Sequence, residues 1–204
     1  MFRSGGKTAD AFSCWLPRGP DDLLTEMSKK NVIVISGGPG FGKSELIGEL
    51  KKLGYQTGEE YARSLIQQQM SCGGDVLPWK NMKQFMNEVM KQRIHFYQSV
   101  ADGTVAFADR GLPDHLAFAR YRGMKPPETV LENIRAHPYF PVVFITPPWK
   151  EIYSTDEVRQ ECFEEAELLH QFICGVYREL GYELAELPRT DPASRARFVT
   201  DYLS

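Results

Sequence analysis

The sequence has no apolar run of the length that a bilayer-spanning helix needs, so we expect no transmembrane segment. It also has no run of basic residues, and its formal net charge is −3. Both features argue against binding to a nucleic-acid backbone, and no nucleic-acid partner is expected. An N-K-x-D run of the kind found in guanine-specific proteins is absent too, which favours ATP over GTP.

Cysteine and histidine are scarce, with four residues of each in 204. No two cysteines have the C-x-x-C spacing and the histidines lie far apart, which argues against a structural zinc site. Free thiols in a reducing cytosol are the default expectation, so we predict a cytoplasmic protein. The four cysteines are Cys14, Cys72, Cys162 and Cys174.

The first 27 residues differ in composition from the rest of the chain. They show no periodic apolar pattern, and Pro17, Gly19 and Pro20 interrupt them. They also lack the apolar segment of a secretory signal. We therefore expect a flexible N-terminal extension over residues 1–27 and one nucleotide-binding domain over residues 28–204.

The most informative motif is a glycine-rich run between a predicted strand and a predicted helix. Residues 37–44 have the sequence G-G-P-G-F-G-K-S, which matches the phosphate-binding pattern G-x-x-x-x-G-K-[ST]. The backbone N–H groups of such a loop form a concave anion site, and the helix N-terminus adds its positive dipole end. We expect nucleotide contacts from Gly37, Gly38, Pro39, Gly40, Phe41, Gly42, Lys43, Ser44 and Glu45.

Two residues of this loop have specific predicted roles. Lys43 is expected to reach the β- and γ-phosphates, and Ser44 is expected to hold Mg²⁺ through its hydroxyl group. Phe41 is unusual, because such loops often carry a small residue there. Its side chain is expected to point outward or to cover a ligand, since the backbone must stay close to the phosphates.

Buried strands and amphipathic helices alternate along the chain. The pattern predicts strands over residues 31–36, 55–60, 105–108, 142–145 and 183–187, with helices between them. Continuous apolar strands indicate a parallel sheet covered by helices on both faces. Ligands of such sheets bind beyond the carboxyl ends of the strands, so residues that follow the strands are the candidates for chemistry.

Charged residues follow two of these strands. Asp109 ends the third strand, where it is expected to accept a proton from a substrate hydroxyl or to hold Mg²⁺ through water; a turn-capping aspartate is the alternative. Arg110 is expected to clamp an anionic substrate, with a surface salt bridge as the alternative. Glu60 and Arg63 lie one helical turn apart and are predicted to contact the substrate, or to form an ordinary helix pair.

Arg159 falls between the fourth strand and a predicted long helix. A segment that closes over the triphosphate would let this arginine neutralise charge in the transition state, and a solvated helix start is the alternative. Trp79 and Trp149 are candidates for stacking on a base, or for ordinary packing.

Several motifs occur together in a fixed order over about residues 31–202. They are the glycine loop, an E-x-x-A-R-like run at 59–63, D-R-G-L-P-D at 109–114, P-P-W-K-E-I-Y-x-x-D-x-x-R at 147–159 and G-Y-E-L-x-x-L-P at 181–188. With these motifs the chain resembles the AAA-type P-loop group that includes the ribosylnicotinamide kinase domain and many small predicted ATPases.

This resemblance implies a three-layer α/β P-loop NTPase fold, similar to nucleoside and nucleotide kinases, with a five-stranded parallel sheet. It implies ATP or GTP bound with Mg²⁺, a lid segment that carries Arg159, and active-site roles for Asp109 and Arg110. A eukaryotic branch of the group is linked to GTP and phosphoinositides. No residue pattern selects nicotinamide riboside, so that substrate is not carried over.

Two functions are consistent with these features. The first is a kinase that transfers the γ-phosphate of MgATP to a small-molecule hydroxyl, with a nucleoside-like acceptor and Asp109 as the base. The alternative is a nucleotide-dependent binding or regulatory module that recruits a protein or a phosphoinositide. A mechanical ATPase ranks last, because the chain is short for the additional helical domain of such machines.

Overall fold

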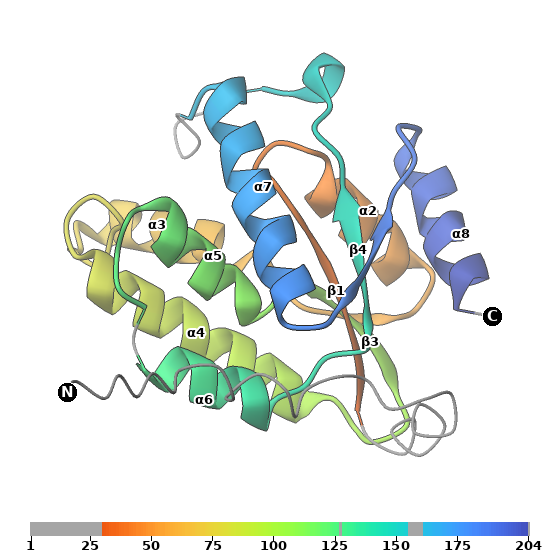
Figure 1. Cartoon of the computed structure of the whole chain (residues 1–204), viewed down its shortest axis with the longest axis horizontal. Coiled ribbons are helices and arrows are strands. Elements are labelled where there is room, and N and C mark those ends of the chain that lie inside the picture. The colour runs from red at the N-terminus through yellow and green to blue at the C-terminus, as the bar shows by residue number, and fades with distance from the viewer. Residues whose placement is uncertain (1–29, 127, 155–160, 204) are drawn as a thin grey trace, which may run out of the picture.

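A five-stranded parallel sheet forms the centre of the computed structural model, which describes residues 30–126, 128–154 and 161–203 (Figure 1). The strand order is β2-β3-β1-β4-β5, and every neighbouring pair is parallel. The three-layer α/β fold predicted from the sequence is thereby confirmed. The strands are β1 (Asn31–Gly37), β2 (Gln56–Thr57), β3 (Val105–Asp109), β4 (Val142–Thr146) and β5 (Glu183–Glu186).

The register of the sheet brings three strand ends to one edge. β1 lies between β3 and β4, with Ile35 opposite Asp109 and Gly37 opposite Thr146. The glycine loop that leaves β1 and the carboxylate that ends β3 therefore share the carboxyl edge. A site that uses both the glycine loop and this carboxylate must lie at that edge, because both follow strands that run in the same direction.

Seven helices and one 3₁₀ turn cover the sheet within the described residues. In Figure 1, α2 and α8 lie on one side of β4 and α7 on the other. The helices are α2 (Lys43–Lys52), α3 (Tyr61–Cys72), α4 (Met82–Ser99), α5 (Pro113–Tyr121), α6 (Glu128–Ala136), α7 (Phe163–Glu179) and α8 (Pro192–Tyr202), and the 3₁₀ turn is η1 (Lys150–Ile152).

Alternating side chains of β1 divide the core into two clusters. Val32 and Val34 pack in the larger cluster with residues of α4, α5, α6 and α7, whereas Ile33 and Ile35 pack against α2 and α8. All four side chains are buried. Because each face of the strand is covered, β1 is a continuous apolar run, which is why the sequence identified it.

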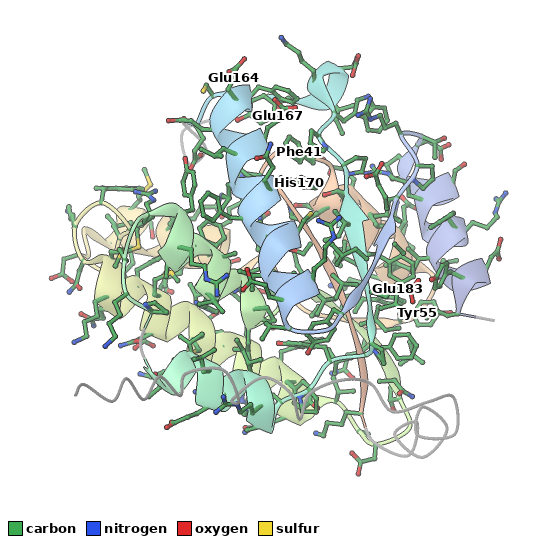
Figure 2. The ribbon with its side chains drawn as sticks, in the orientation of Figure 1. Phe41, Tyr55, Glu164, Glu167, His170 and Glu183 are labelled. Atoms are coloured by element: carbon green, nitrogen blue, oxygen red, sulfur yellow. The ribbon has the colours of Figure 1, made fainter. Side chains whose placement is uncertain are left out.

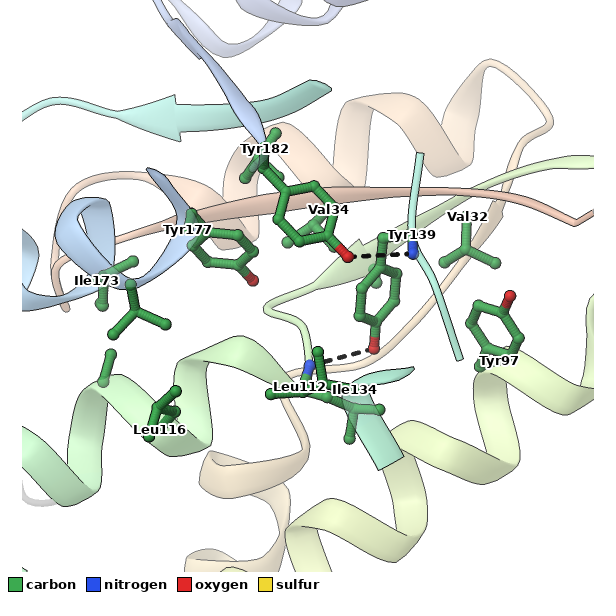
Figure 3. Packing of buried hydrophobic residues seen from close by; sticks show 14 of the residues in the cluster. Val32, Val34, Tyr97, Leu112, Leu116, Ile134, Tyr139, Ile173, Tyr177 and Tyr182 are labelled. Atoms are coloured by element: carbon green, nitrogen blue, oxygen red, sulfur yellow. Dashed lines mark hydrogen bonds between the residues drawn. The ribbon is translucent and has the colours of Figure 1, made fainter. Parts of the chain in front are cut away.

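Tyrosine hydroxyl groups tie the larger cluster to the backbone (Figure 3). The Tyr139 hydroxyl accepts a hydrogen bond from the Leu112 amide at 3.2 Å, and the Tyr182 hydroxyl accepts one from the Tyr139 amide at 3.4 Å. Burial raises the pKa of Tyr139, so its hydroxyl stays protonated. These bonds fix the turn between β3 and α5 against the segment that enters β4.

One predicted strand is shorter in the structure. The second strand, predicted over 55–60, covers only Gln56–Thr57. Helix α4 begins at Met82, because the Asn81 side chain accepts a hydrogen bond from the Gln84 amide and caps the helix.

Two further predictions concern membrane-spanning segments and the N-terminal extension. Among the described residues, no helix combines the length and the apolar character that a membrane span requires. The predicted extension over residues 1–27 lies outside the described residues.

Candidate active site

The glycine loop makes a tight turn between β1 and α2. Gly40 and Gly42 have φ values of 77° and 74°, in the left-handed region that side chains disfavour. A Cβ on Gly42 would also lie 2.7 Å from the Arg195 guanidinium. The loop therefore needs glycine at position 42 for its conformation, and a larger residue there would also displace the Arg195 side chain.

The lysine of the loop is buried beneath it. Lys43 Nζ donates hydrogen bonds to the carbonyl oxygens of Gly38 at 2.6 Å and Gly37 at 3.3 Å. Burial, helped by the positive charge of Arg110, lowers the pKa of Lys43 to about 7. Neutral carbonyl groups are modest partners for an ammonium group. A phosphate oxygen would be a stronger one.

The serine of the loop and the carboxylate after β2 are in direct contact. Ser44 Oγ donates a hydrogen bond to Glu60 Oε2 at 2.9 Å. Glu60 is the residue directly before α3 and is half-buried. The two predicted site residues are 16 positions apart in the sequence, and the sheet edge brings them together.

Asp109 ends β3 and is almost completely buried. Burial raises the pKa of Asp109 more than the nearby Lys43 ammonium lowers it, and the resulting pKa is about 6. Its Oδ1 atom has no hydrogen-bond partner within the described part of the chain. A buried carboxylate oxygen without a donor is suited to a cation or to a water molecule that a cation holds.

The donor set fits Mg²⁺ only together with other ligands. The described residues contain no group of three or more His, Cys, Asp or Glu side chains arranged to hold a metal ion. Mg²⁺ usually keeps several waters and takes one or two protein oxygens together with substrate phosphates. The Ser44 hydroxyl and, through water, Asp109 are the oxygens that this arrangement offers.

Arg110 forms a buried ion pair, and the surface salt bridge that the sequence left open for it does not occur. Its backbone has a φ of 65°, and its Nη1 atom donates to Asp114 Oδ1 at 2.9 Å. Asp114, 0% exposed, also accepts hydrogen bonds from the Tyr177 hydroxyl at 2.6 Å, the Ser36 hydroxyl at 2.7 Å and the Gly111 amide at 2.9 Å. Asp114 thus joins β1, α5 and α7.

Two cavities meet at Glu60. The smaller, of about 280 Å³, is bounded by the glycine loop, α2 and α8, and the larger, of about 820 Å³, by α3, α4, α5 and the start of α7. Glu60 lines both cavities, and Arg63 and Arg110 line the larger one. The predicted substrate residues therefore face one space. Of the predicted nucleotide contacts, five line the adjoining space, namely Gly40, Gly42, Lys43, Ser44 and Glu45. Pro39 lines the larger cavity, and Gly37, Gly38 and Phe41 line neither.

Three cationic or titratable side chains at these cavities were missed by the sequence analysis. Arg195 donates to the Gly42 carbonyl at 3.0 Å and lies 5.8 Å from the Trp149 ring, at the smaller cavity. Arg93 and His115 line the larger cavity and are buried. Arg93 follows Val89 by one turn on the apolar face of α4, and a charged residue on such a face was the signal that could have revealed it.

The expectation for Phe41 was wrong. Its side chain is only 1% exposed and packs against the rings of Tyr153, Phe163 and His170, at centroid distances of 6.2, 5.8 and 6.0 Å. Figure 2 shows Phe41 beside His170 of α7. The ring anchors the loop to α7, so a large residue there stabilises the loop from behind.

The remaining predicted residues have separate outcomes. Arg159 lies outside the described residues, so its role in a lid segment stays a prediction. Trp79 is exposed at the larger cavity and Trp149 lines the smaller one. The proposal that an aromatic ring contacts the nucleotide base thus applies to Trp149.

Comparison with solved structures identifies the same fold in small-molecule kinases. The NadR protein in complex with NR has 17% identity and a TM-score of 0.59, with 89% of this chain and 52% of that chain covered. This chain therefore spans about half of that protein. Deoxyadenosine kinase from M. mycoides with bound dCTP has 16% identity and a TM-score of 0.56, with coverage of 84% and 98%.

Shikimate kinase from Acinetobacter baumannii in complex with shikimate is also similar, at 12% identity and a TM-score of 0.51, with 89% of this chain and 96% of that chain covered. At these identities the similarity shows the fold. A comparison with curated protein sequences finds no match. The model of the family described as AAA domain matches residues 32–195, which include the glycine loop, Asp109 and Arg195. The chain therefore belongs to the AAA domain family of P-loop proteins.

Proposed function

We propose that the protein is a kinase that transfers the γ-phosphate of MgATP to the hydroxyl group of a small molecule. The observation that carries this proposal is the pair of cavities that adjoin at Glu60 beside the glycine loop. The smaller cavity has the residues for a nucleoside triphosphate, and the larger has room for an acceptor. Phosphoryl transfer needs these two substrates to be held in line more than it needs covalent chemistry.

On the nucleotide side, the loop amides and Lys43 would hold the β- and γ-phosphates, and Ser44 and Asp109 would hold Mg²⁺. Bound Mg²⁺ supplies positive charge to the phosphate oxygens. The Arg195–Trp149 pair, at the smaller cavity, offers a flat surface to a purine base. ATP is the first nucleotide to test, and GTP stays open as the alternative.

On the acceptor side, we place the role of the base on Glu60 rather than on Asp109. Glu60 lines both cavities, whereas Asp109 lines neither of them and lies buried beside Lys43. A base must reach the proton that it accepts, so position decides before acidity does. Arg63 and Arg110 are the predicted contacts to the acceptor.

The direct test is a screen of acceptors with purified protein, ATP and Mg²⁺. Nucleosides and related alcohols are incubated with the enzyme, and phosphorylated products are detected by mass spectrometry and ³¹P NMR. The expected result is ATP-dependent phosphorylation of at least one class of acceptor. If ATP binds normally and no acceptor is phosphorylated, the kinase proposal is contradicted.

Replacing Lys43 by alanine is expected to weaken MgATP binding by about 10- to 100-fold. The change removes one charge-assisted contact to the phosphates, which contributes about 1.5–3 kcal/mol. Calorimetry in the presence of Mg²⁺ measures the affinity, and circular dichroism checks the fold. Lys52→Ala is the matched control, because Lys52 is an exposed lysine at the other end of α2. Equal affinity of wild type and Lys43→Ala would contradict the assigned role.

The remaining expectations concern partners and location. None of the similar proteins described above supports the alternative of a phosphoinositide or protein partner. Cys72, Cys162 and Cys174 are free thiols. Because free thiols persist in a reducing compartment, we retain the proposal of a cytoplasmic location.

A further inference from the structure

Among the residues that the structure describes, those that line the larger cavity carry an excess of positive charge, although the whole chain has a net charge of −3. Three of these residues are carboxylates, namely Glu60, Glu161 and Glu165. Twice as many cationic side chains do so, namely Arg63, Lys83, Arg93, Arg110, Arg122 and Lys125. A cleft lined mainly by one sign of charge raises the local concentration of the opposite charge.

Two buried side chains of this cavity have polar atoms without partners. Arg93 is 5% exposed and His115 is 2% exposed. Arg93 Nη1 donates to the Gly111 carbonyl at 3.0 Å, but neither Arg93 Nε nor His115 Nε2 has a hydrogen-bond partner within the described ranges. An unpartnered buried polar group destabilises the protein, so a ligand that supplies a hydrogen-bond partner is favoured.

Arg93 also lacks an ion-pair partner among the described residues. Asp114 lies near both Arg93 and Arg110, but it forms its ion pair with Arg110. Across residues 30–126, 128–154 and 161–203, no carboxylate forms an ion pair with Arg93. Burial lowers the pKa of His115 well below its ordinary value, so the imidazole is neutral and donates one hydrogen bond. The charge of Asp109 also acts on Arg93, but without an ion pair between them. An oxyanion placed against Arg93 would supply the direct ion pair that this guanidinium lacks.

Much of the remaining wall is apolar. Met82, Met86 and Met90 follow one another at four-residue spacing along α4 and line the cavity, and Phe118 of α5 lines it too. Methionine side chains adapt to irregular shapes and contact aromatic rings favourably. The cavity thus suits an apolar or aromatic body that also carries an anionic group.

We infer that Arg93 and His115 form an oxyanion-binding subsite, and that the acceptor carries a carboxylate or phosphate group in addition to the hydroxyl that faces Glu60. Naming the ligand an acceptor rests on the proposed kinase function, whereas the binding of an oxyanion does not. The acceptor is then an anion with an apolar or aromatic body, and neutral nucleosides are poorer ligands of this cavity.

The test uses the nucleotide-free full chain and three probes that share a benzene ring: phenyl phosphate, benzoate and benzyl alcohol. Binding is followed in ¹⁵N NMR spectra through the Nε–H signal of Arg93, which is assigned by its loss in Arg93→Lys. We expect at least one anionic probe to shift this signal and to bind at least tenfold more tightly than benzyl alcohol. Preference for phenyl phosphate identifies a phosphate group on the acceptor, and preference for benzoate identifies a carboxylate.

Two variants locate the effect within the cavity. Arg93→Gln is expected to weaken the anionic probe at least tenfold, and Lys83→Gln, at an exposed lysine of the same cavity, to change it less than threefold. An Arg93 signal that no probe moves, or equal affinities for the three probes, overturns the inference. If Arg93→Gln does not fold, the titrations of the wild-type protein with the three probes are sufficient to test the inference. Since no nucleotide is present, failure of phosphoryl transfer and failure of this subsite are separate results.

Discussion

Replacing Glu60 by glutamine is expected to lower kcat for phosphoryl transfer by about 10²- to 10⁴-fold, the usual contribution of a positioned general base. The substitution keeps the size of the side chain and its ability to accept the Ser44 hydrogen bond. It removes the negative charge that accepts the proton of the acceptor. The loop amides are unchanged, and Glu60 is only one of three carboxylates that raise the pKa of Lys43, so the affinity for MgATP is expected to stay close to that of the wild type.

Steady-state kinetics with the acceptor found in the screen measure this effect, and calorimetry measures MgATP binding. Glu59→Gln is the matched control, since Glu59 is an exposed neighbour that lines neither cavity. Asp109→Asn tests whether Asp109 rather than Glu60 acts as the general base. If Asp109→Asn abolishes transfer and Glu60→Gln retains nearly full kcat, then Asp109 is the base and the assignment to Glu60 is wrong.

Local sequence patterns predicted the parts of the site that a single segment builds. The glycine loop needs only β1 before it and α2 after it, so residues 37–44 were enough to predict the loop and its place between these elements. Phosphate binding by this loop stays a proposal. The position of Asp109 was predicted in the same way, because a continuous apolar strand that ends in a carboxylate marks the sheet edge. The contact between Ser44 and Glu60 is consistent with the predicted position of candidate residues beyond the strand ends, since parallel strands end at one edge.

Contacts between distant segments were beyond the sequence patterns. Asp114 was part of a recognised motif, but its partners come from β1 and α7, 78 and 63 residues away, and no spacing rule fixes that meeting. Phe41 was misjudged for the same reason, because its contacts lie on α7 and in the segment before it. Arg195 meets the loop across 153 residues.

Replacing Asp114 by alanine is expected to destabilise the fold by about 3–5 kcal/mol, the cost of breaking a buried ion pair from one side. Arg110 would keep its buried positive charge without a carboxylate, and the Tyr177 and Ser36 hydroxyls would lose their acceptor. Since whole domains unfold with about 5–15 kcal/mol, this single change removes a large share of the stability. Urea unfolding followed by circular dichroism measures it.

The stability lost in Asp114→Ala is expected to depend on pH, because it comes from the ionised Asp114 carboxylate. Burial alone would raise the pKa of Asp114, but Arg110, Arg93 and the hydroxyl donors hold it below its ordinary value. Its contribution is therefore complete above the unfolded-state pKa of about 3.9 and disappears as pH falls through the lower folded-state pKa. The difference in unfolding free energy between wild type and Asp114→Ala should accordingly shrink in acid.

Tyr177→Phe and Asp102→Asn complete this experiment. Tyr177→Phe removes one donor and keeps the buried ring, so it is expected to cost about 1.5–3 kcal/mol, the range for a hydrogen bond to a charged group. Asp102 is exposed in the turn before β3, and Asp102→Asn should change stability by less than about 0.5 kcal/mol. If Asp114→Ala costs no more than Asp102→Asn, the carboxylate is not the centre that joins β1, α5 and α7. Arg110 would then be held at the larger cavity by the backbone of its turn and by the Phe118 ring, whose centroid lies 5.4 Å from the guanidinium.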